Sequence, residues 1–369
     1  MKKQKNHPDF ILSATISLLL LLGFAILAGV SITVSQKIFG HSFQFLMHQI
    51  EYGYLPGLIL GFLAYKINLK SLRKISLPAL FIVIVLMGLV FMPKIGVSTG
   101  GASRWVALGP IVIQPSELLK LIFIIYLAAW LTKHKEQRKK SVQLFLPFII
   151  ILAVVCALLI KQPDISTLVT IAAITLVMYF SAETPLWQTG LLILSGIGAL
   201  AILIKTAPYR LNRFLVLLRP AAQPLGIGYQ MKQALIAIGS GGIIGHGLGL
   251  SVQKAGFLPE PMTDSIFAVF AEETGFIGAI ILVLLFLIFA WQGFKIAKQS
   301  SETFLKLMAI GITSWLTLQA FINIGAMIGL LPLTGIPLPL VSYGSSHLVM
   351  ELIAIGLLLN ISKHAKNNF

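Results

Sequence analysis

Long apolar runs separated by short polar segments divide this sequence, and this alternation restricts the fold more than any other feature. A bilayer core of ~30 Å requires about 20 apolar residues per spanning helix, with a working range of about 17–25. Read with that length, the chain predicts an all-α membrane protein of about ten transmembrane helices. The predicted spans are 10–34, 51–67, 75–93, 116–132, 143–160, 165–181, 186–205, 265–292, 305–329 and 338–361.

The composition agrees with a membrane protein and excludes a water-soluble one. Hydrophobic residues make up 57% of the chain and charged residues 11%, against about 25% charged in soluble domains. The first run is longer than the ~7–15-residue core of a cleavable signal peptide, so we expect it to be retained as a span. The single cysteine, Cys156, lies in an apolar run, which predicts a packing role and excludes a disulfide.

The positive charge indicates membrane topology rather than nucleic-acid binding. The net charge is +16, but the basic residues form short clusters between apolar runs and no basic helix or stripe. Most of them lie at the N-terminus, near residues 66–74, 133–140 and 295–306, and at the C-terminus. The positive-inside rule then places both termini in the cytoplasm. We find no internal repeat, and residues 1–369 are expected to form a single membrane domain.

One outer segment, about residues 206–264 between the seventh and eighth spans, is too long to be a simple connector. Ordered loops of this length are usually functional. Its basic side chains suit a phosphorylated substrate, because guanidinium and ammonium groups pair with phosphate. They could equally meet lipid headgroups, and charge alone leaves both interpretations open. These residues are Lys205, Arg210, Arg213, Arg219, Lys232 and Lys254.

The few acidic residues fall into two groups of functional interest. Glu51, Glu117, Asp164, Glu260 and Asp264 are predicted at outer helix ends or in the outer loop. The second group lies inside predicted spans, where an ionisable side chain is expensive and is a functional-site hypothesis by default. The alternative for this second group is a buried, paired network that holds helices together. Its members are Glu272, Glu273 and Glu351.

Four stretches carry motifs: GASRWVALGPIVIQPSELLKL (101–121), KQPDISTL (161–168), the segment from GYQMKQALIAIGSGG to TDSIFAVFAEETGFIG (228–278) and NIGAMIGLLPLTGIPLPLVSYGSS (323–346). The first predicts an interfacial turn at Arg104 and Trp105, followed by a helix that begins at Pro115. Glu117 and Lys120 then share a helix face and can pair. The second stretch opens the sixth span at Asp164.

The glycine-rich part of the third stretch does not read as a nucleotide site. Its glycines match neither GxxxxGK[ST] nor GxGxxG, and they are predicted to lie outside the membrane. Close backbone packing or a hinge for a long lipid substrate is the expected role. The glycines are Gly239, Gly241, Gly242, Gly245, Gly247 and Gly249.

Taken in order, these motifs resemble the SEDS family, the FtsW and RodA proteins of bacterial cell division and elongation. The resemblance rests on QPSE with Lys120, QPD, QA–AIGSGG–GLG, FLPE–TD–IFAV–AEE, and GLLP–TG–PLP–SYG. It covers most of the chain. The SVQK run at 251–254 favours the division branch, whereas TGIPLP at 334–339 favours elongation. Departures from the usual pattern occur at His246, Met262, Ser265 and Ser345-Ser346-His347.

The resemblance implies a peptidoglycan glycosyltransferase that polymerises lipid II on the outer face of the inner membrane. It implies that Asp264 is the general base; the alternative is a simple helix N-cap. A divalent cation, Mg or Mn, could bridge the diphosphate to a carboxylate such as Asp164. The implied substrate-binding residues are Arg104, Glu117, Lys120, Lys161, Asp164, Arg210, Arg213, Gln233, Lys254, Glu260 and Ser342.

The resemblance also implies a partner, a single-span class B penicillin-binding protein whose transpeptidase cross-links the new glycan. Two other functions stay open for such a chain. A lipid II flippase would be expected to carry charged or broken helices near the middle of paired repeats. A non-catalytic scaffold would tolerate the loss of Asp264.

Overall fold

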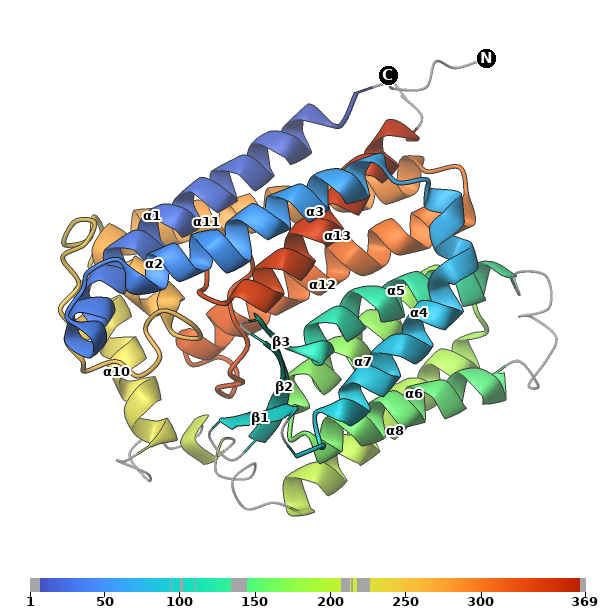
Figure 1. The fold of residues 1–369 in the computed structure, drawn as a ribbon, viewed down its shortest axis with the longest axis horizontal. Helices are drawn as coiled ribbons and strands as arrows, with labels where there is room; N and C mark the ends of the chain where they lie inside the picture. Colours follow the sequence, from blue (N-terminus) through green and yellow to red (C-terminus); the bar gives the residue numbers. More distant parts are fainter. Residues whose placement is uncertain are drawn as a thin grey trace.

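The computed structural model is a bundle of long helices with one small sheet (Figure 1). It describes residues 7–93, 95–99, 102–109, 111–133, 145–206, 213, 215–217 and 226–365. The helices are α1 (Phe10–Phe39), α2 (Gln44–Gln49), α3 (Leu55–Lys66), α4 (Leu69–Leu89), α5 (Pro115–Lys133), α6 (Phe145–Lys161), α7 (Ile165–Ser181), α8 (Leu186–Thr206), α10 (Ile227–Ser240), α11 (Ile266–Gln299), α12 (Thr303–Met327) and α13 (Ser345–Lys363).

The predicted all-α membrane fold is confirmed. Seven described helices are long and apolar enough to cross a membrane, and α6 and α7 are shorter apolar helices. The predicted span 51–67 corresponds to a continuous helical run in which a π-helical turn, Ile50–Tyr54, joins α2 to α3. Each predicted span therefore has a helix.

The start of the last predicted span was wrong. Residues 338–344 are not helical, and α13 begins at Ser345. Pro339 disfavours helical geometry at Leu338, and Leu340 and Gly344 have φ +64° and +151°, which lie outside the right-handed helical region. The apolar run therefore begins several residues before the helix does.

Glycines let α3 and α13 approach one another closely. A Cβ on Gly356 would lie 2.0 Å from the carbonyl oxygen of Gly61, and a Cβ on Gly61 would lie 2.7 Å from that of Leu352. Gly57 and Gly61 form a small-xxx-small pair of the type that brings membrane helices together. The contact fixes α13 against α3 near the centre of both helices.

A three-stranded antiparallel sheet precedes α5. Its strands are β1 (Gly96–Thr99), β2 (Ala102–Leu108) and β3 (Ile111–Ile113), in the order β1-β2-β3. The turn predicted at Arg104 and Trp105 was wrong, since both residues lie within β2, where Trp105 pairs with Val97. Short strands with few turn signals are hard to distinguish from a loop in an apolar sequence.

A break in α11 is filled by the glycine-rich segment. Gly275 has φ +67° and interrupts the helix. The amides of Phe276 and Ile277 bond instead to the carbonyls of Gly242 and Ile243, at 2.9 and 3.1 Å. A Cβ on Gly245 would lie 2.2 Å from the Glu273 carbonyl oxygen. The close backbone packing expected of the glycines is present at Gly241 and Gly245, whereas a Cβ on Gly239, Gly242 or Gly249 would meet no atom within 4 Å.

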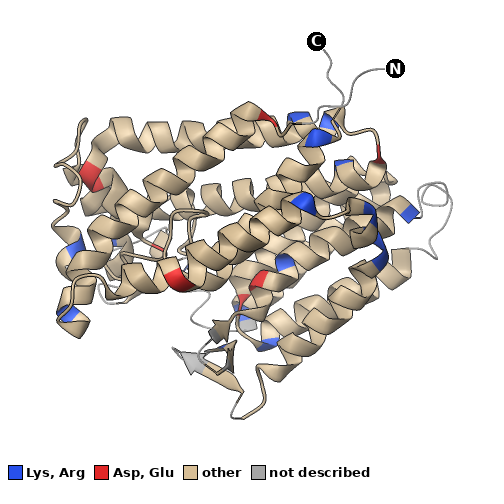
Figure 2. Ribbon diagram, turned by 45° about the horizontal axis from the view of Figure 1, so that its top comes forward, with Lys and Arg blue, Asp and Glu red and all other residues tan. Residues whose placement is uncertain are grey.

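The two ends of the bundle differ. α1 begins and α13 ends at one end of the bundle, while α10 and the segment before α11 lie at the other (Figure 1). Several Lys and Arg residues gather at the end that carries the termini (Figure 2).

Candidate functional site

Asp264 lies just before α11, at the end of the bundle opposite the termini. Its side chain is half-buried, and among the described residues no hydrogen bond reaches its carboxylate oxygens. Burial is the main cause that raises the pKa of Asp264 to about 6 from 3.8, and the Glu260 carboxylate adds to the rise. Arg213 and Arg104 act in the opposite direction. The N-cap alternative is not what the structure shows, because Ser265 occupies that position without a side-chain bond.

The backbone at Asp264 is held by hydrogen bonds to three successive carbonyl oxygens. The Tyr343 amide donates to the Met262 oxygen at 2.8 Å, and Ser342 Oγ donates to the Thr263 oxygen at 2.6 Å. Asn323 Nδ2 donates to the oxygen of Asp264 itself at 2.8 Å. We call residues 262–264 the catalytic segment, after the general base that the resemblance implies at Asp264. It is bound on one side by α12 and by the loop before α13.

Two arginines supply positive charge beside Asp264. Arg104 in β2 donates from Nε to the Gln162 carbonyl oxygen at 3.4 Å and from Nη2 to that of Pro163. Arg213 Nη1 donates to the Leu333 carbonyl oxygen at 2.9 Å. Each guanidinium is thus held by backbone oxygens and still lies near enough to affect the Asp264 pKa. Arg210 and Arg219 lie outside the described residues.

Glu260 and Gln233 lie near this segment in different ways. Glu260 is exposed, and its carboxylate accepts a hydrogen bond from Thr263 Oγ1 at 2.9 Å. Gln233 is half-buried on α10. Its neighbour Gln230, rather than Gln233, reaches the residue after Asp264, with Nε2 3.1 Å from Ser265 Oγ.

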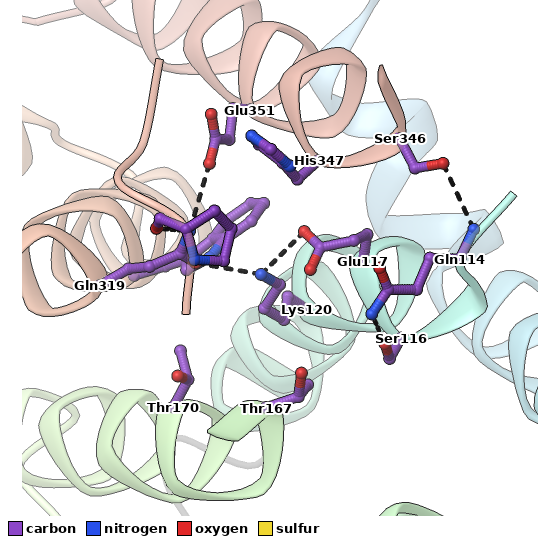
Figure 3. Close-up of polar contacts among 12 residues, drawn as sticks. Gln114, Ser116, Glu117, Lys120, Thr167, Thr170, Gln319, Ser346, His347 and Glu351 are labelled. Carbon is purple, nitrogen blue, oxygen red and sulfur yellow. Dashed lines mark hydrogen bonds and ion pairs between the residues drawn. The ribbon is translucent and has the colours of Figure 1, made fainter. Parts of the chain in front are cut away.

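A buried polar network lies among α5, α12 and α13 (Figure 3). Lys120 forms the expected ion pair with Glu117 at 2.8 Å and donates to Gln319 Oε1 at 3.0 Å. Gln319 Nε2 lies 3.3 Å from Glu351 Oε1, and Glu351 Oε2 accepts the Leu340 amide at 2.8 Å. These side chains are almost fully buried. Glu117 and Lys120 therefore hold helices together beneath the loop before α13 and are not exposed to a substrate.

Asp164 and Lys161 have roles of their own away from Asp264. Asp164 caps α7: its oxygens accept hydrogen bonds from the Thr167 amide, Thr167 Oγ1 and Ser116 Oγ at 3.2, 2.9 and 3.0 Å. The side chain is 4% exposed, so it does not fit the cation bridge suggested from the sequence. Lys161 is exposed, with Nζ 4.7 Å above the Phe91 ring.

No described group of three His, Cys, Asp or Glu side chains could hold a metal ion. The described carboxylates with oxygens open to solvent near the catalytic segment are those of Asp264 and Glu260. The divalent cation stays a prediction, and no step of the chemistry below depends on it.

Lys254 does not face the catalytic segment. Its ammonium is paired with Glu273 Oε1 at 2.8 Å and donates to the carbonyl oxygens of Gly249 and Gly29 at 2.7 and 3.2 Å. All three N–H groups are therefore engaged, which leaves none for a diphosphate. Glu272 accepts from Ser251 Oγ and, at 2.9 Å, from the Val252 amide. The embedded acids accordingly form the paired network that was one of the two alternatives.

The positions that depart from the family pattern have defined contacts. Met262 is buried, and Ser265 Oγ accepts from Gln230. Ser346 Oγ donates to the Val112 oxygen at 3.2 Å, and His347 Nε2 lies 3.2 Å from the Ser342 oxygen. Ser346 and His347 thus support the sheet and the loop before α13, whereas Ser345 Oγ has no hydrogen-bond partner among the described residues.

Sequence reasoning missed Gln319 and Asn323, which bind the loop before α13 from α12. Gln319 Nε2 donates to the Pro337 oxygen at 3.1 Å, and Asn323 Nδ2 to the Ile336 oxygen at 2.7 Å. A signal was present, since two amide side chains four residues apart share one face of an otherwise apolar helix.

Comparison with known proteins gives consistent matches over the whole fold. The model of the FtsW, RodA and SpoVE family, described as a cell cycle protein, matches residues 10–367. A probable peptidoglycan glycosyltransferase FtsW of Thioalkalivibrio sulfidiphilus is 40% identical over 358 residues, covering 96% of this chain and 89% of that protein. The stage V sporulation protein E of Bacillus subtilis is 36% identical over 366 residues, covering 99% of this chain and all of its own length (100%).

Solved structures agree. The rod shape determining protein RodA of Thermus thermophilus superposes with a TM-score of 0.72 at 25% identity, covering 98% of each chain. A chain of a peptidoglycan synthase complex that coordinates polymerization and crosslinking gives a TM-score of 0.76 at 26% identity, covering 96% of this chain and 97% of that one.

Proposed function

Because this chain belongs to the family of FtsW, RodA and SpoVE, we propose that it is a peptidoglycan glycosyltransferase that polymerises lipid II with Asp264 as general base. The observation that carries the proposal is the Asp264 carboxylate. It is fixed through its backbone, open to solvent, and flanked by two arginines. A base works best when its pKa lies near the working pH, and the rise to about 6 moves this carboxylate in that direction.

In the proposed reaction Asp264 accepts the proton of the acceptor sugar's 4-hydroxyl as that oxygen attacks the donor's anomeric carbon. The bond from this carbon to the lipid diphosphate breaks, and the configuration inverts. The diphosphate leaves with the electron pair of that bond. Arg104 and Arg213 stabilise the charge that develops on it, because guanidinium groups bind phosphate in fork geometry. Arg210 stays a predicted member of this group.

The test is polymerisation of labelled lipid II by purified protein. Asp264→Ala is compared with wild type and with Glu51→Ala, which removes an exposed carboxylate at the same end of the bundle. Long glycan chains from wild type and Glu51→Ala, and none from Asp264→Ala, are the expected result. Chains made by Asp264→Ala would remove this residue from the chemistry. If the wild type made no glycan chains even with its partner present, the proposed polymerase function would be wrong.

We also propose the partner and the orientation. Polymerisation is useful to the cell only if a transpeptidase cross-links the product, and the chain is similar to a member of a peptidoglycan synthase complex. A single-span class B penicillin-binding protein is the proposed partner. The basic clusters near both termini support a cytoplasmic location for them, and Asp264 would then lie on the outer side of the inner membrane.

A further inference from the structure

Asn323 is a buried amide whose two N–H groups join two segments of the outer loops. One N–H binds the oxygen of Asp264 at 2.8 Å, and the other binds the oxygen of Ile336 at 2.7 Å. The side chain is 1% exposed, and its own oxygen has no partner among the described residues. Burying an amide side chain in an apolar helix costs free energy unless its N–H groups are hydrogen-bonded. Here both donors are used, one at the catalytic segment and the other at the loop before α13.

Ser342, in the loop before α13, also binds the backbone of the catalytic segment. Its Oγ donates to the Thr263 oxygen at 2.6 Å and accepts the Leu338 amide at 2.8 Å. The residue is 2% exposed, so it is out of reach of a substrate. The substrate-binding role implied for Ser342 by resemblance does not fit this position. Ser342 instead links the loop before α13 to the residue adjoining Asp264.

Side chains of α12 and α13 bind the loop before α13. Gln319, one helical turn from Asn323, binds the Pro337 oxygen, and Glu351 binds the Leu340 amide. The buried ion pair of Glu117 and Lys120 is joined to both through Gln319. The catalytic segment and the buried network of α5, α12 and α13 are therefore both bound to the backbone of the loop at residues 336–342.

We propose that Asn323 and Ser342 are positioning residues for the transfer reaction: they hold the catalytic segment by its backbone oxygens and do not touch substrate. This inference rests on the proposed function, because it assigns a purpose to the geometry around Asp264. The Asp264 carboxylate itself accepts no hydrogen bond among the described residues, so its placement depends on the backbone. A displacement of about 1 Å at a reacting group can cost about 100-fold in rate.

Asn323→Asp is the most informative variant. It keeps the shape of the side chain and replaces the NH2 group, which donates to both carbonyl oxygens, by a carboxyl oxygen. The chain offers a matched control. Asn360 on α13 is also buried and also bridges two carbonyl oxygens, those of Ala64 and Ile67, at 3.2 and 2.8 Å. It lies near the C-terminus, at the other end of the bundle from Asp264. Asn360→Asp makes the same chemical change away from the site.

The experiment measures kcat and KM for lipid II polymerisation together with the apparent Tm of each purified variant. We expect kcat to fall about 100-fold in Asn323→Asp, with KM changed less than about twofold, because no substrate contact is lost. Asn360→Asp is expected to keep the wild-type kcat, at a Tm as low as that of Asn323→Asp. Equal losses of kcat in both variants would show a general loss of structure and overturn the proposal.

Ser342→Ala tests the second residue and guards against poor folding of Asn323→Asp. It removes one donor and adds no charge, and it is expected to lower kcat without changing KM. If Ser342→Ala and a folded Asn323→Asp both keep the wild-type kcat, the positioning role is wrong while the polymerase stands. If wild type itself makes no glycan, the proposed function fails instead.

Discussion

Asp264 can accept a proton only when it is ionised, so the pKa of about 6 sets the acid limit of the reaction. We expect the polymerisation rate to rise with pH from 5 and to level off above about 7, with a midpoint near the pKa of Asp264. A pH profile of kcat/KM on purified protein measures this. A flat profile across that range would contradict a base with a raised pKa.

Lys254 and Glu273 form a second residue-scale test, on stability. Their side chains are 4% and 1% exposed, and removal of one partner leaves a buried charge uncompensated. Lys254→Met is expected to lower the free energy of unfolding by about 3–5 kcal/mol. The double variant Lys254→Met/Glu273→Gln is expected to recover most of the loss. Thermal unfolding in detergent measures both, with Lys232→Met on the exposed face of α10 as the control.

The contrast between these residues shows what sequence could and could not predict. The Glu117–Lys120 pair follows from helical spacing, and the structure confirms it. Lys254 was assigned to the substrate because it is basic and lies in an outer loop. Its partner Glu273 is 19 residues away, and the fold of the loop that joins them depends on the break in α11. Spacing along the chain does not encode such a contact.

At the scale of elements, the joint between the glycine-rich segment and α11 tolerates no added side chain. Gly245 has φ +77°, and a Cβ there would lie 2.2 Å from the Glu273 oxygen. We expect Gly245→Ala to destabilise the protein by at least about 2 kcal/mol. Gly239→Ala on α10, where no atom lies within 4 Å of the added Cβ, is expected to be neutral or stabilising by about 0.5–1 kcal/mol. Thermal unfolding of the two variants checks the difference.

The helices were predictable, while the segments between them were only partly so. Runs of about 20 apolar residues predicted the spans, because lipid requires every backbone group to bond within a helix. The sheet at 96–113 and the non-helical run at 338–344 were missed. Their conformation follows from partners far away in the chain: Ser346 binds Val112, 234 residues earlier, and Ser342 binds Thr263, 79 residues earlier.

At the scale of the whole molecule, the shared end of both termini leads to a topology prediction. Alkaline phosphatase is active only outside the cytoplasm. We expect activity from a fusion after Ser240, at the end of α10, and none from fusions after Ser300 or at the C-terminus. Measured enzyme activity in cells, normalised to the amount of fusion protein, checks this. The reverse pattern would place Asp264 in the cytoplasm, where the proposed polymerisation does not occur.

The break at Gly275 also bears on how the chain enters the membrane during synthesis. A helix of 34 residues measures about 51 Å, well beyond a hydrocarbon core of ~30 Å. The interruption leaves 276–299 as the stretch that partitions into lipid, and its first part carries no charge. In the proposed orientation we expect Glu272 and Glu273 to be translocated together with the outer loop. Their partners Ser251 and Lys254 belong to the same loop, so neither carboxylate would have to cross hydrocarbon to reach its partner.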